Sequence, residues 1–224
     1  MTTLYTHDEY IRPVVAECLI KYFNLDIEII DITDDVDKFL SNFPVRTVPG
    51  LLFEDGTILF EQMAVINYII YKSMNTHEIN QLLDKDEYPL VKSETIMFCS
   101  FCTSDFFNTL VTYCLTDIKS IPITKEETLN ASKTLDAMFP IFENKLSKHK
   151  FLTGNHITIA DLIAAASFSK GFISMLDHKW RMKHPLIDNW FREVIGSKYM
   201  AYRFENFKFV ENAHRLSHRM LPWF

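Results

Sequence analysis

An apolar run with a helix-start signal at its beginning is the feature that most constrains how this chain can fold. From Ile159 to Phe168 the sequence has no charge after Asp161, so a helix here has no face suited to water. Thr158 and Asp161 stand at capping-box spacing, in which each side chain bonds the other residue's backbone N–H. Other helices must therefore surround this segment. We predict that it is the central helix of an all-α domain, with Thr158 and Asp161 in structural roles.

Composition excludes several classes of protein. Hydrophobic residues make up 48% of the 224 positions and aromatic residues 14%, which indicates a packed chain rather than a disordered one. The net charge is −6 and basic residues are spread along the sequence, which disfavours direct binding of nucleic acid. We expect no signal peptide and no membrane span. Four cysteines in apolar stretches favour reduced thiols and a cytoplasmic location: Cys18, Cys99, Cys102 and Cys114.

The first third of the chain alternates strand and helix signals. Short β-favouring or alternating runs predict strands, periodic apolar residues predict helices, and Asp55-Gly56 is a hairpin signal. The expected elements are a strand at Thr2–Thr6, a helix at Tyr10–Phe23, a strand at Ile27–Ile32, a helix at Asp34–Leu40, strands at Leu51–Glu54 and Thr57–Phe60, and a helix at Gln62–Lys72. This order predicts an α/β, thioredoxin-like domain over residues 1–74.

The rest of the chain has helical patterns and no strand signal of any strength. Residues 75–87 are polar and are interpreted as a linker, and residues 88–224 as an all-α domain. Besides the central helix, we expect helices at Tyr88–Leu115, at Lys125–Lys148 with a kink at Pro140, and at Pro185–Ile195, with a loop at Asp177–His184. The tail from Ser197 onward is expected to pack loosely over both domains.

Motifs in both halves of the chain resemble the soluble glutathione transferase fold. They are a Val-Pro pair before a hairpin, an acidic-polar pair that opens the next helix, and the box Thr158-Ile159-Ala160-Asp161. Further segments resemble most the N-terminal domain of the elongation factor 1-gamma family: Leu4–Arg12, Phe43–Pro49, Phe60–Ile69 and Phe207–Phe209. The resemblance therefore covers nearly the whole chain.

This resemblance implies a scaffold of protein synthesis rather than an enzyme. In the elongation factor 1-gamma family the domain anchors the guanine-nucleotide exchange subunit of the elongation factor 1 complex, and it forms homodimers in some members. We therefore expect a cytoplasmic protein–protein interaction module with no required cofactor, and with subunits of the elongation factor 1 complex as partners. The full gamma subunit continues into a second domain, whereas this sequence stops at Phe224.

Transferase chemistry would need a side chain that ionises the thiol of glutathione. In the superfamily a Tyr, Ser or Cys just after the first strand does this. By spacing from Arg12, the usual Tyr position falls on Thr6 and the usual Ser position on Asp8, and a carboxylate repels a thiolate. Thr6, with Tyr5 or Tyr10 if the loop bends, is a candidate for a catalytic hydroxyl, but none is the expected residue in the expected place.

Two enzymatic functions of the same fold are alternatives to the scaffold. One is a glutathione S-transferase that conjugates glutathione to small electrophiles through Thr6 or a nearby tyrosine. The other, a peroxidase or dehydroascorbate reductase of the same fold, lacks its cysteine. The non-catalytic interpretation is preferred, and fold alone does not decide function.

The resemblance also assigns a vestigial glutathione site. Val48-Pro49 resembles the Val followed by cis-Pro whose backbone pairs with the cysteinyl part of glutathione, and Arg12 is grouped with it. Glu61-Gln62 resembles the acidic-Ser pair that holds the γ-glutamyl end, with Gln in place of Ser. The same residues also suit an ordinary turn and helix cap in any thioredoxin-like domain, so glutathione is an optional ligand in this interpretation.

No metal site is expected. Cys99 and Cys102 form a C-x-x-C pair, but they lie in the helical half, whereas redox pairs in this fold follow the first strand. Zinc would need two further ligands nearby, and only Cys114 is a candidate. His214 and His218 are one helical turn apart, but a solvated tail is the favoured interpretation.

Overall fold

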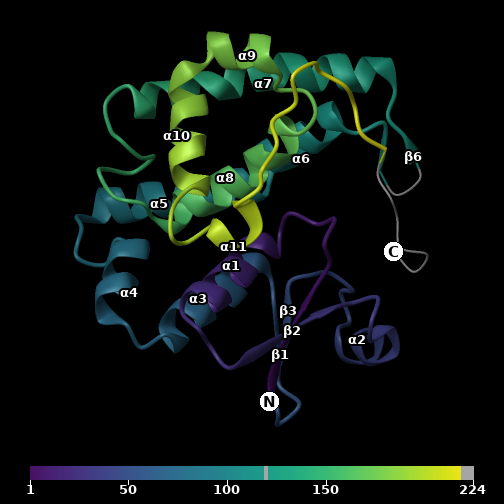
Figure 1. Cartoon of the computed structure of the whole chain (residues 1–224), viewed down its shortest axis with the longest axis vertical. Coiled ribbons are helices and arrows are strands. Elements are labelled where there is room, and N and C mark those ends of the chain that lie inside the picture. Colours follow the sequence, from purple (N-terminus) through teal and green to yellow (C-terminus); the bar gives the residue numbers. More distant parts are fainter. Residues whose placement is uncertain (119–120, 218–224) are drawn as a thin grey trace.

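The first part of the chain forms a four-stranded sheet that carries helices on both faces (Figure 1). The computed structural model describes residues 1–118 and 121–217. The strands are β1 (Thr2–Thr6), β2 (Ile27–Asp31), β3 (Gly50–Leu52) and β4 (Ile58–Phe60), in the order β2-β1-β3-β4. β1 pairs with β2 in parallel, and β1–β3 and β3–β4 are antiparallel. This mixed sheet confirms the predicted thioredoxin-like arrangement.

Alternation along β1 explains why both faces of the sheet are covered. Leu4 packs in one core with helices α1 (Val14–Tyr22) and α3 (Gln62–Lys72). Tyr5 points to the opposite face and packs in a second core with Phe39 of α2 (Val36–Asn42), as the two-residue period of a strand requires. Helices α1 and α3 therefore cover one face of the sheet, and α2 covers the other.

The first helix begins later than the sequence pattern suggested. The sequence predicts a helix from Tyr10, whereas α1 starts at Val14 after Pro13, which stands at its N-cap with φ −72°. Proline suits a helix start because its fixed φ is already helical and its missing N–H needs no partner there. Residues 7–13 are thereby left as a loop at the end of β1, and this loop borders the second domain.

The second part of the chain is a helical assembly built around α8 (Ile159–Phe172). The surrounding helices are α5 (Pro89–Thr103), α6 (Asp105–Cys114), α7 (Lys125–Leu146) and α10 (Pro185–Ile195). Helices α5, α6 and α10 pack on α8, and Phe142 of α7 contacts Phe168 of α8 with ring centroids 4.9 Å apart. All residues of α8 except Lys170 are buried. The prediction of a central helix without a solvent face is confirmed.

The capping box predicted at the start of α8 is present and is extended by two further donors. The Asp161 carboxylate accepts from the Thr158 backbone N–H at 3.0 Å and from the Thr158 hydroxyl at 3.2 Å. It also accepts from the Leu152 N–H and from the Trp190 indole N–H, both at 2.9 Å. Asp161 therefore ties together the loop before α8, the helix itself and α10.

Two expectations about regular structure were wrong, and the predicted linker contains a helix that was not anticipated. The linker contains a helix, α4 (Thr76–Leu82), because Asn75 caps it by accepting from the Glu78 N–H at 3.2 Å. The loop after α8 contains α9 (His178–Lys183), which is capped in the same way by Asp177. Two-residue strands, β5 (Asp117–Ile118) and β6 (Ile121–Pro122), form where no strand was expected.

The long helix predicted over Tyr88–Leu115 is two helices, and the break falls at Ser104. Its backbone, with φ −119° and ψ −92°, is not helical, and its hydroxyl donates to the Ser100 carbonyl at 2.7 Å. Such local bonding by serine competes with the helical ladder. By contrast, α7 continues through Pro140.

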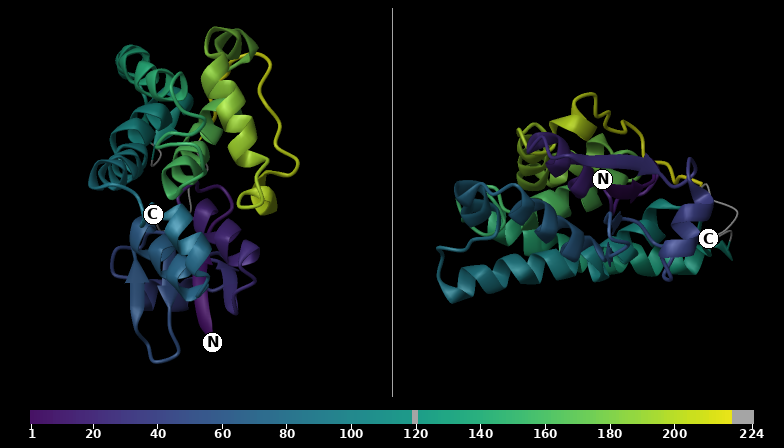
Figure 2. Two further views of the ribbon diagram at one scale, coloured as in Figure 1. Left: turned by 90° about the vertical axis from the view of Figure 1, so that its left-hand side faces the viewer. Right: turned by 90° about the horizontal axis from the view of Figure 1, so that it is seen from below.

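The tail is held against the helical domain by backbone hydrogen bonds. The N–H groups of Val210, His214 and Leu216 donate to carbonyls of Phe172, Ser174 and Cys114, at 2.8, 2.9 and 2.8 Å. Figure 2 shows this yellow segment along the side of the helices. The start of the tail packs on the first domain instead: α11 (Ala201–Phe204) lies against α1, and Tyr199 packs edge-on against Tyr22 of α1 with ring centroids 4.9 Å apart. The expected loose packing over both domains is therefore replaced by a fixed path.

Candidate functional site

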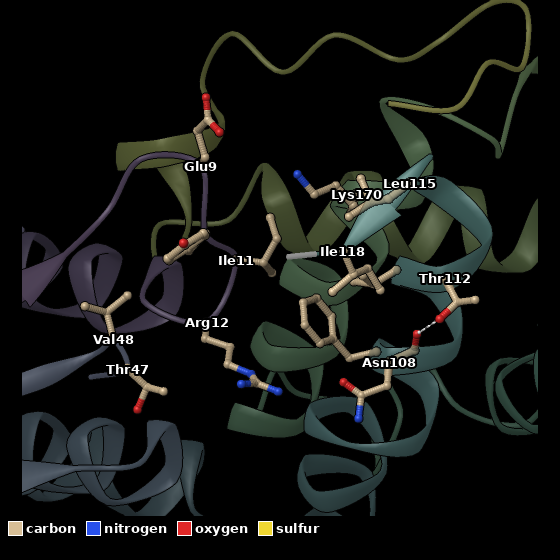
Figure 3. Close-up of a pocket in the computed structure, with 13 residues that line it drawn as sticks. Glu9, Ile11, Arg12, Thr47, Val48, Asn108, Thr112, Leu115, Ile118 and Lys170 are labelled. Atoms are coloured by element: carbon tan, nitrogen blue, oxygen red, sulfur yellow. Dashed lines mark hydrogen bonds between the residues drawn. The ribbon is translucent and has the colours of Figure 1, made fainter. Parts of the chain in front are cut away.

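A cavity of about 430 Å³ lies between the two domains (Figure 3). The loop after β1 and the turn before β3 form one wall, and α6, the residues after it and α8 form the other. Much of the lining is apolar, with Ile11 and Val48 on one side and Phe107, Val111 and Leu115 on the other. Small-molecule sites typically have this size and character.

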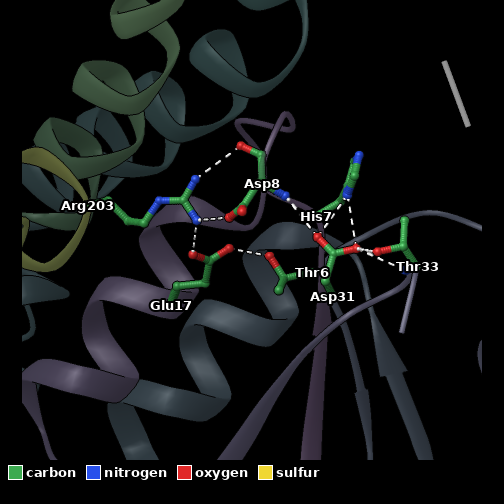
Figure 4. A network of polar contacts seen from close by, with 7 residues as sticks. All are labelled: Thr6, His7, Asp8, Glu17, Asp31, Thr33 and Arg203. Carbon is green, nitrogen blue, oxygen red and sulfur yellow. Dashed lines mark hydrogen bonds and ion pairs between the residues drawn. The ribbon is translucent and has the colours of Figure 1, made fainter. Parts of the chain in front are cut away.

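Thr6, the first candidate for a catalytic hydroxyl, is buried at the end of β1 and does not line the cavity. Its hydroxyl donates a hydrogen bond to the carboxylate of Glu17 on α1 (Figure 4). The other carboxylate oxygen of Glu17 pairs with Arg203 of α11 at 2.6 Å. A hydroxyl has one proton to donate, so the proton of Thr6 is already used within the protein.

Arg203 also pairs with Asp8, the residue at the position where some transferases have their catalytic serine. Arg203 contacts the Asp8 carboxylate at 3.0 Å and donates to the Asp8 carbonyl at 3.1 Å. Glu17 is 1% exposed, so the Glu17–Arg203 pair is largely shielded from water, whereas the Asp8 side chain is 85% exposed. We call Thr6, Asp8, Glu17 and Arg203 the interdomain latch, because Arg203 comes from the helical domain and the other three from the first domain.

The next part of the loop is fixed from the sheet side. Asp31, at the end of β2, accepts from His7 at 2.9 Å, from the Asp8 N–H at 3.2 Å, and from Thr33 (Figure 4). Burial alone would raise the pKa of Asp31, but the hydrogen bonds from Thr33 and His7 outweigh it and hold that pKa below its ordinary value. The loop is therefore anchored from both domains.

The two tyrosine candidates lie in different environments. Tyr5 is fully buried in the second core, where its hydroxyl donates to Asp35 at 3.3 Å, and burial raises its pKa to about 12. Tyr10 is half-buried, lines the cavity and packs edge-on against His7 with ring centroids 4.9 Å apart. Burial and the charge of Glu9 raise the pKa of Tyr10. Of the three candidates, only Tyr10 borders the cavity.

The five residues assigned to glutathione fall into two groups. The Val48–Pro49 bond is cis, and Val48 and Arg12 both line the cavity. The guanidinium of Arg12 lies 5.5 Å from the centre of the Phe107 ring, across the domain boundary. Glu61 is exposed with φ +72°, and Gln62 is 8% exposed in the first turn of α3, and neither lines the cavity.

Sequence reasoning missed three residues that shape this region. Glu17 and Arg203 form the latch, and they are 186 positions apart, so no local pattern links them. Lys170 lines the cavity from α8. The signal for Lys170 was available, because it is the one charged residue of α8 after Asp161.

The cysteines behave as core residues. All four thiols are buried, and burial raises the pKa of Cys114 to about 11 and that of Cys99 further.

Within residues 1–118 and 121–217, no group of three or more His, Cys, Asp or Glu side chains is arranged to hold a metal. His214 donates its backbone N–H to Ser174, and His218 lies outside the described residues. No described helix is long and apolar enough to cross a bilayer.

Comparison with known proteins identifies the family. Residues 1–70 match the model of the glutathione S-transferase N-terminal domain, and residues 101–198 match that of the C-terminal domain. A Saccharomyces cerevisiae protein described as a homolog of elongation factor 1 gamma is 33% identical over 90% of both chains. Elongation factor 1-gamma 1 of the same yeast is 29% identical over 93% of this chain, which spans about half of that relative's length (50%).

Comparison of the three-dimensional structure with solved structures points to the same family. The crystal structure of the GST-like domain of elongation factor 1-gamma from Saccharomyces cerevisiae superposes with a TM-score of 0.85 and 28% identity, over 97% of this chain and 99% of that domain. Both domains, in the same order and nearly complete, are therefore shared. The chain belongs to the glutathione S-transferase superfamily, among the homologues of elongation factor 1-gamma.

Proposed function

We propose that this protein is a non-catalytic interaction module of the elongation factor 1-gamma type, which acts in the cytoplasm as part of the protein-synthesis machinery. Its partners are subunits of the elongation factor 1 complex, and it requires no cofactor. The similarity over both domains to elongation factor 1-gamma supports this proposal. The proposal concerns the GST-like region, which is the region this chain shares with that factor.

The interdomain latch is the observation that carries the non-catalytic part. In a transferase the loop after β1 offers a hydroxyl that stabilises a thiolate. Here the hydroxyl of Thr6 is bonded to Glu17, and the Asp8 carboxylate stands in the same loop. Neither Thr6 nor Asp8 lines the cavity, and both are engaged within the protein, Thr6 by Glu17 and Asp8 by Arg203, so neither is offered to a thiolate there. The loop therefore holds the domains together rather than activating sulfur.

An outward face of α5 supports the interaction part. Every exposed residue of α5 is uncharged: Pro89, Leu90, Ser93, Ile96, Met97 and Ser100. The opposite face packs on α8. An interface between two identical copies brings a surface against itself, so a face without charge suits it, because no charge then meets its like. We infer that α5 pairs with α5 of a second copy in a homodimer.

The homodimer is tested by placing a charge in this face. We expect Ile96→Lys, at a residue 66% exposed, to convert the dimer to monomer in sedimentation equilibrium, because the two lysines would face each other across the two-fold axis. Leu129→Lys is the matched control, since Leu129 is 56% exposed on α7. A monomeric wild-type chain, or equal effects of both substitutions, would contradict the assignment of α5.

Assembly and catalysis are tested separately. We expect the purified chain to bind the purified guanine-nucleotide exchange subunit of the elongation factor 1 complex in a calorimetric titration. We also expect no turnover of glutathione with a standard aromatic electrophile above the uncatalysed rate. Absence of binding would refute the proposed partner. Turnover would refute the non-catalytic interpretation.

A glutathione transferase that uses Tyr10 is the second candidate function. The observation that favours it is that Tyr10 and Val48, which precedes the cis-Pro, line the same cavity. In that case turnover is measurable in the wild type and is abolished by Tyr10→Phe. That substitution removes the hydroxyl and keeps the ring packed on His7, so a loss of turnover would be chemical rather than structural.

A further inference from the structure

Lys170 carries a nucleophilic group that neither the latch nor the candidate glutathione residues use. It is the one residue of α8 that is not buried, and it lines the cavity from the last turn of that helix. Figure 3 shows its amine extending from the helix toward the loop of the first domain. None of the ion pairs among the described residues includes Lys170. No carboxylate of the described chain therefore holds this amine in a salt bridge.

The surroundings of this amine favour its reactive form. A lysine amine attacks carbon only when it is uncharged, and the loss of hydration in a partly closed site disfavours its charged form. Burial lowers the pKa of the Lys170 amine, and the nearby Cys114 and Glu9 act in the opposite direction without cancelling this effect. Ile11 and Phe107 line the same cavity. A lysine desolvated beside apolar walls is the arrangement found in lysines that react with carbonyl compounds.

We propose that Lys170 is a covalent site that forms an imine with aldehydes carrying an apolar chain. The nitrogen attacks the carbonyl carbon, an N–C bond forms, and a proton moves from nitrogen to oxygen to give a carbinolamine. The C–O bond then breaks, water leaves, and a C=N bond remains. Nothing is oxidised or reduced, so the reaction requires no further reactant. It also requires neither glutathione nor another subunit, so this inference can fail while the proposed function holds.

The test measures where an aldehyde is trapped on the wild-type chain. The protein is incubated with octanal and sodium cyanoborohydride, which reduces an imine to a stable secondary amine, and the adduct on each lysine is quantified by peptide mass spectrometry. We expect Lys170 to be modified at least about tenfold faster than Lys208, because the cavity holds the aldehyde beside the amine. Lys208 is the internal control, since it is exposed and lies in a separate hollow near α11.

Two further measurements show whether the fold and the cavity cause this preference. In the chain unfolded by urea, Lys170 and Lys208 should react at equal rates. Octanol has the same apolar chain without the carbonyl group, so it should slow the modification of Lys170 and leave that of Lys208 unchanged. The proposal is overturned by equal rates in the folded protein, by a preference that persists in urea, or by a rate at Lys170 that octanol does not change.

Discussion

Replacement of Asp161 by alanine should destabilise the fold more than any ordinary surface substitution. Asp161 is 0% exposed and accepts four hydrogen bonds, from Leu152, from Trp190 and twice from Thr158. After Asp161→Ala, two backbone N–H groups and one indole N–H stay buried without an acceptor. The Thr158 hydroxyl can rotate toward Thr153, whose hydroxyl lies 3.3 Å away.

The expected magnitude follows from these orphaned donors. A buried donor without a partner costs roughly 1–3 kcal/mol, so three of them cost roughly 3–9 kcal/mol. Part of this cost is offset, because the substitution also removes a carboxylate whose burial is unfavourable. Burial raises the pKa of Asp161 even though four hydrogen bonds act to lower it. We therefore expect a loss of about 3–5 kcal/mol in the free energy of unfolding, within the range for breaking a buried polar network.

Thermal and urea unfolding, followed by circular dichroism, measure this loss. For a chain of this length about 1 kcal/mol corresponds to about 2–4 °C in Tm, so the midpoint should fall by roughly 6–20 °C. Asp188→Ala is the control: Asp188 also lies in the first turn of a helix, but it pairs with the half-exposed Arg192, and its loss should change stability by less than about 1 kcal/mol. Equal effects of the two substitutions would refute the assigned role of Asp161.

Two further predictions concern the contacts between the domains. Arg203→Met should lower the free energy of unfolding by about 3–5 kcal/mol, because it leaves the Glu17 carboxylate buried without its cationic partner. Adding Glu17→Met to this variant should restore much of the lost stability, because the buried charge is then removed. A double-mutant cycle measures the coupling, and additive effects would contradict the latch. Burial alone would raise the pKa of Glu78, but hydrogen bonds from Lys198, Tyr199 and Tyr22 hold it below its ordinary 4.5. The stabilisation by Glu78 is therefore fully present above pH 4.5 and is lost as the pH falls through the lower, folded-state pKa. The stability difference between wild type and Glu78→Gln, measured from pH 3 to 7, should shrink at the acidic end, and a constant difference would contradict this.

Secondary structure was predictable wherever a short segment contained a local signal such as a helix cap, a turn pair or a proline. The box Thr158–Asp161, the Asp55-Gly56 turn and the proline that opens α10 each placed an element correctly. Two of the errors occurred where a helix is short, at α4 and α9. A helix of six or seven residues has too few turns for an apolar period to be recognised, although the caps at Asn75 and Asp177 could have indicated both.

The candidate site was predictable only in part. The loop after β1 and the Val48–Pro49 turn were singled out from the sequence, and the structure brings Tyr10, Arg12 and Val48 to one cavity. The engagement of Thr6 could not be predicted. It depends on Glu17, one helix later, and on Arg203, near the other end of the chain.

The sequence by itself determined the β-α-β-α-β-β-α order of the first domain and the central position of α8, because periodicity, caps and turn residues act over a few positions. The family followed from the resemblance of its motifs to those of known proteins. Only the tertiary structure decided that Thr6 is bonded to Glu17 and that Lys170 borders a cavity between the domains. The reason is physical: whether a hydroxyl or an amine is free depends on which distant side chain fills the space beside it, and that space exists only after the two domains have packed together.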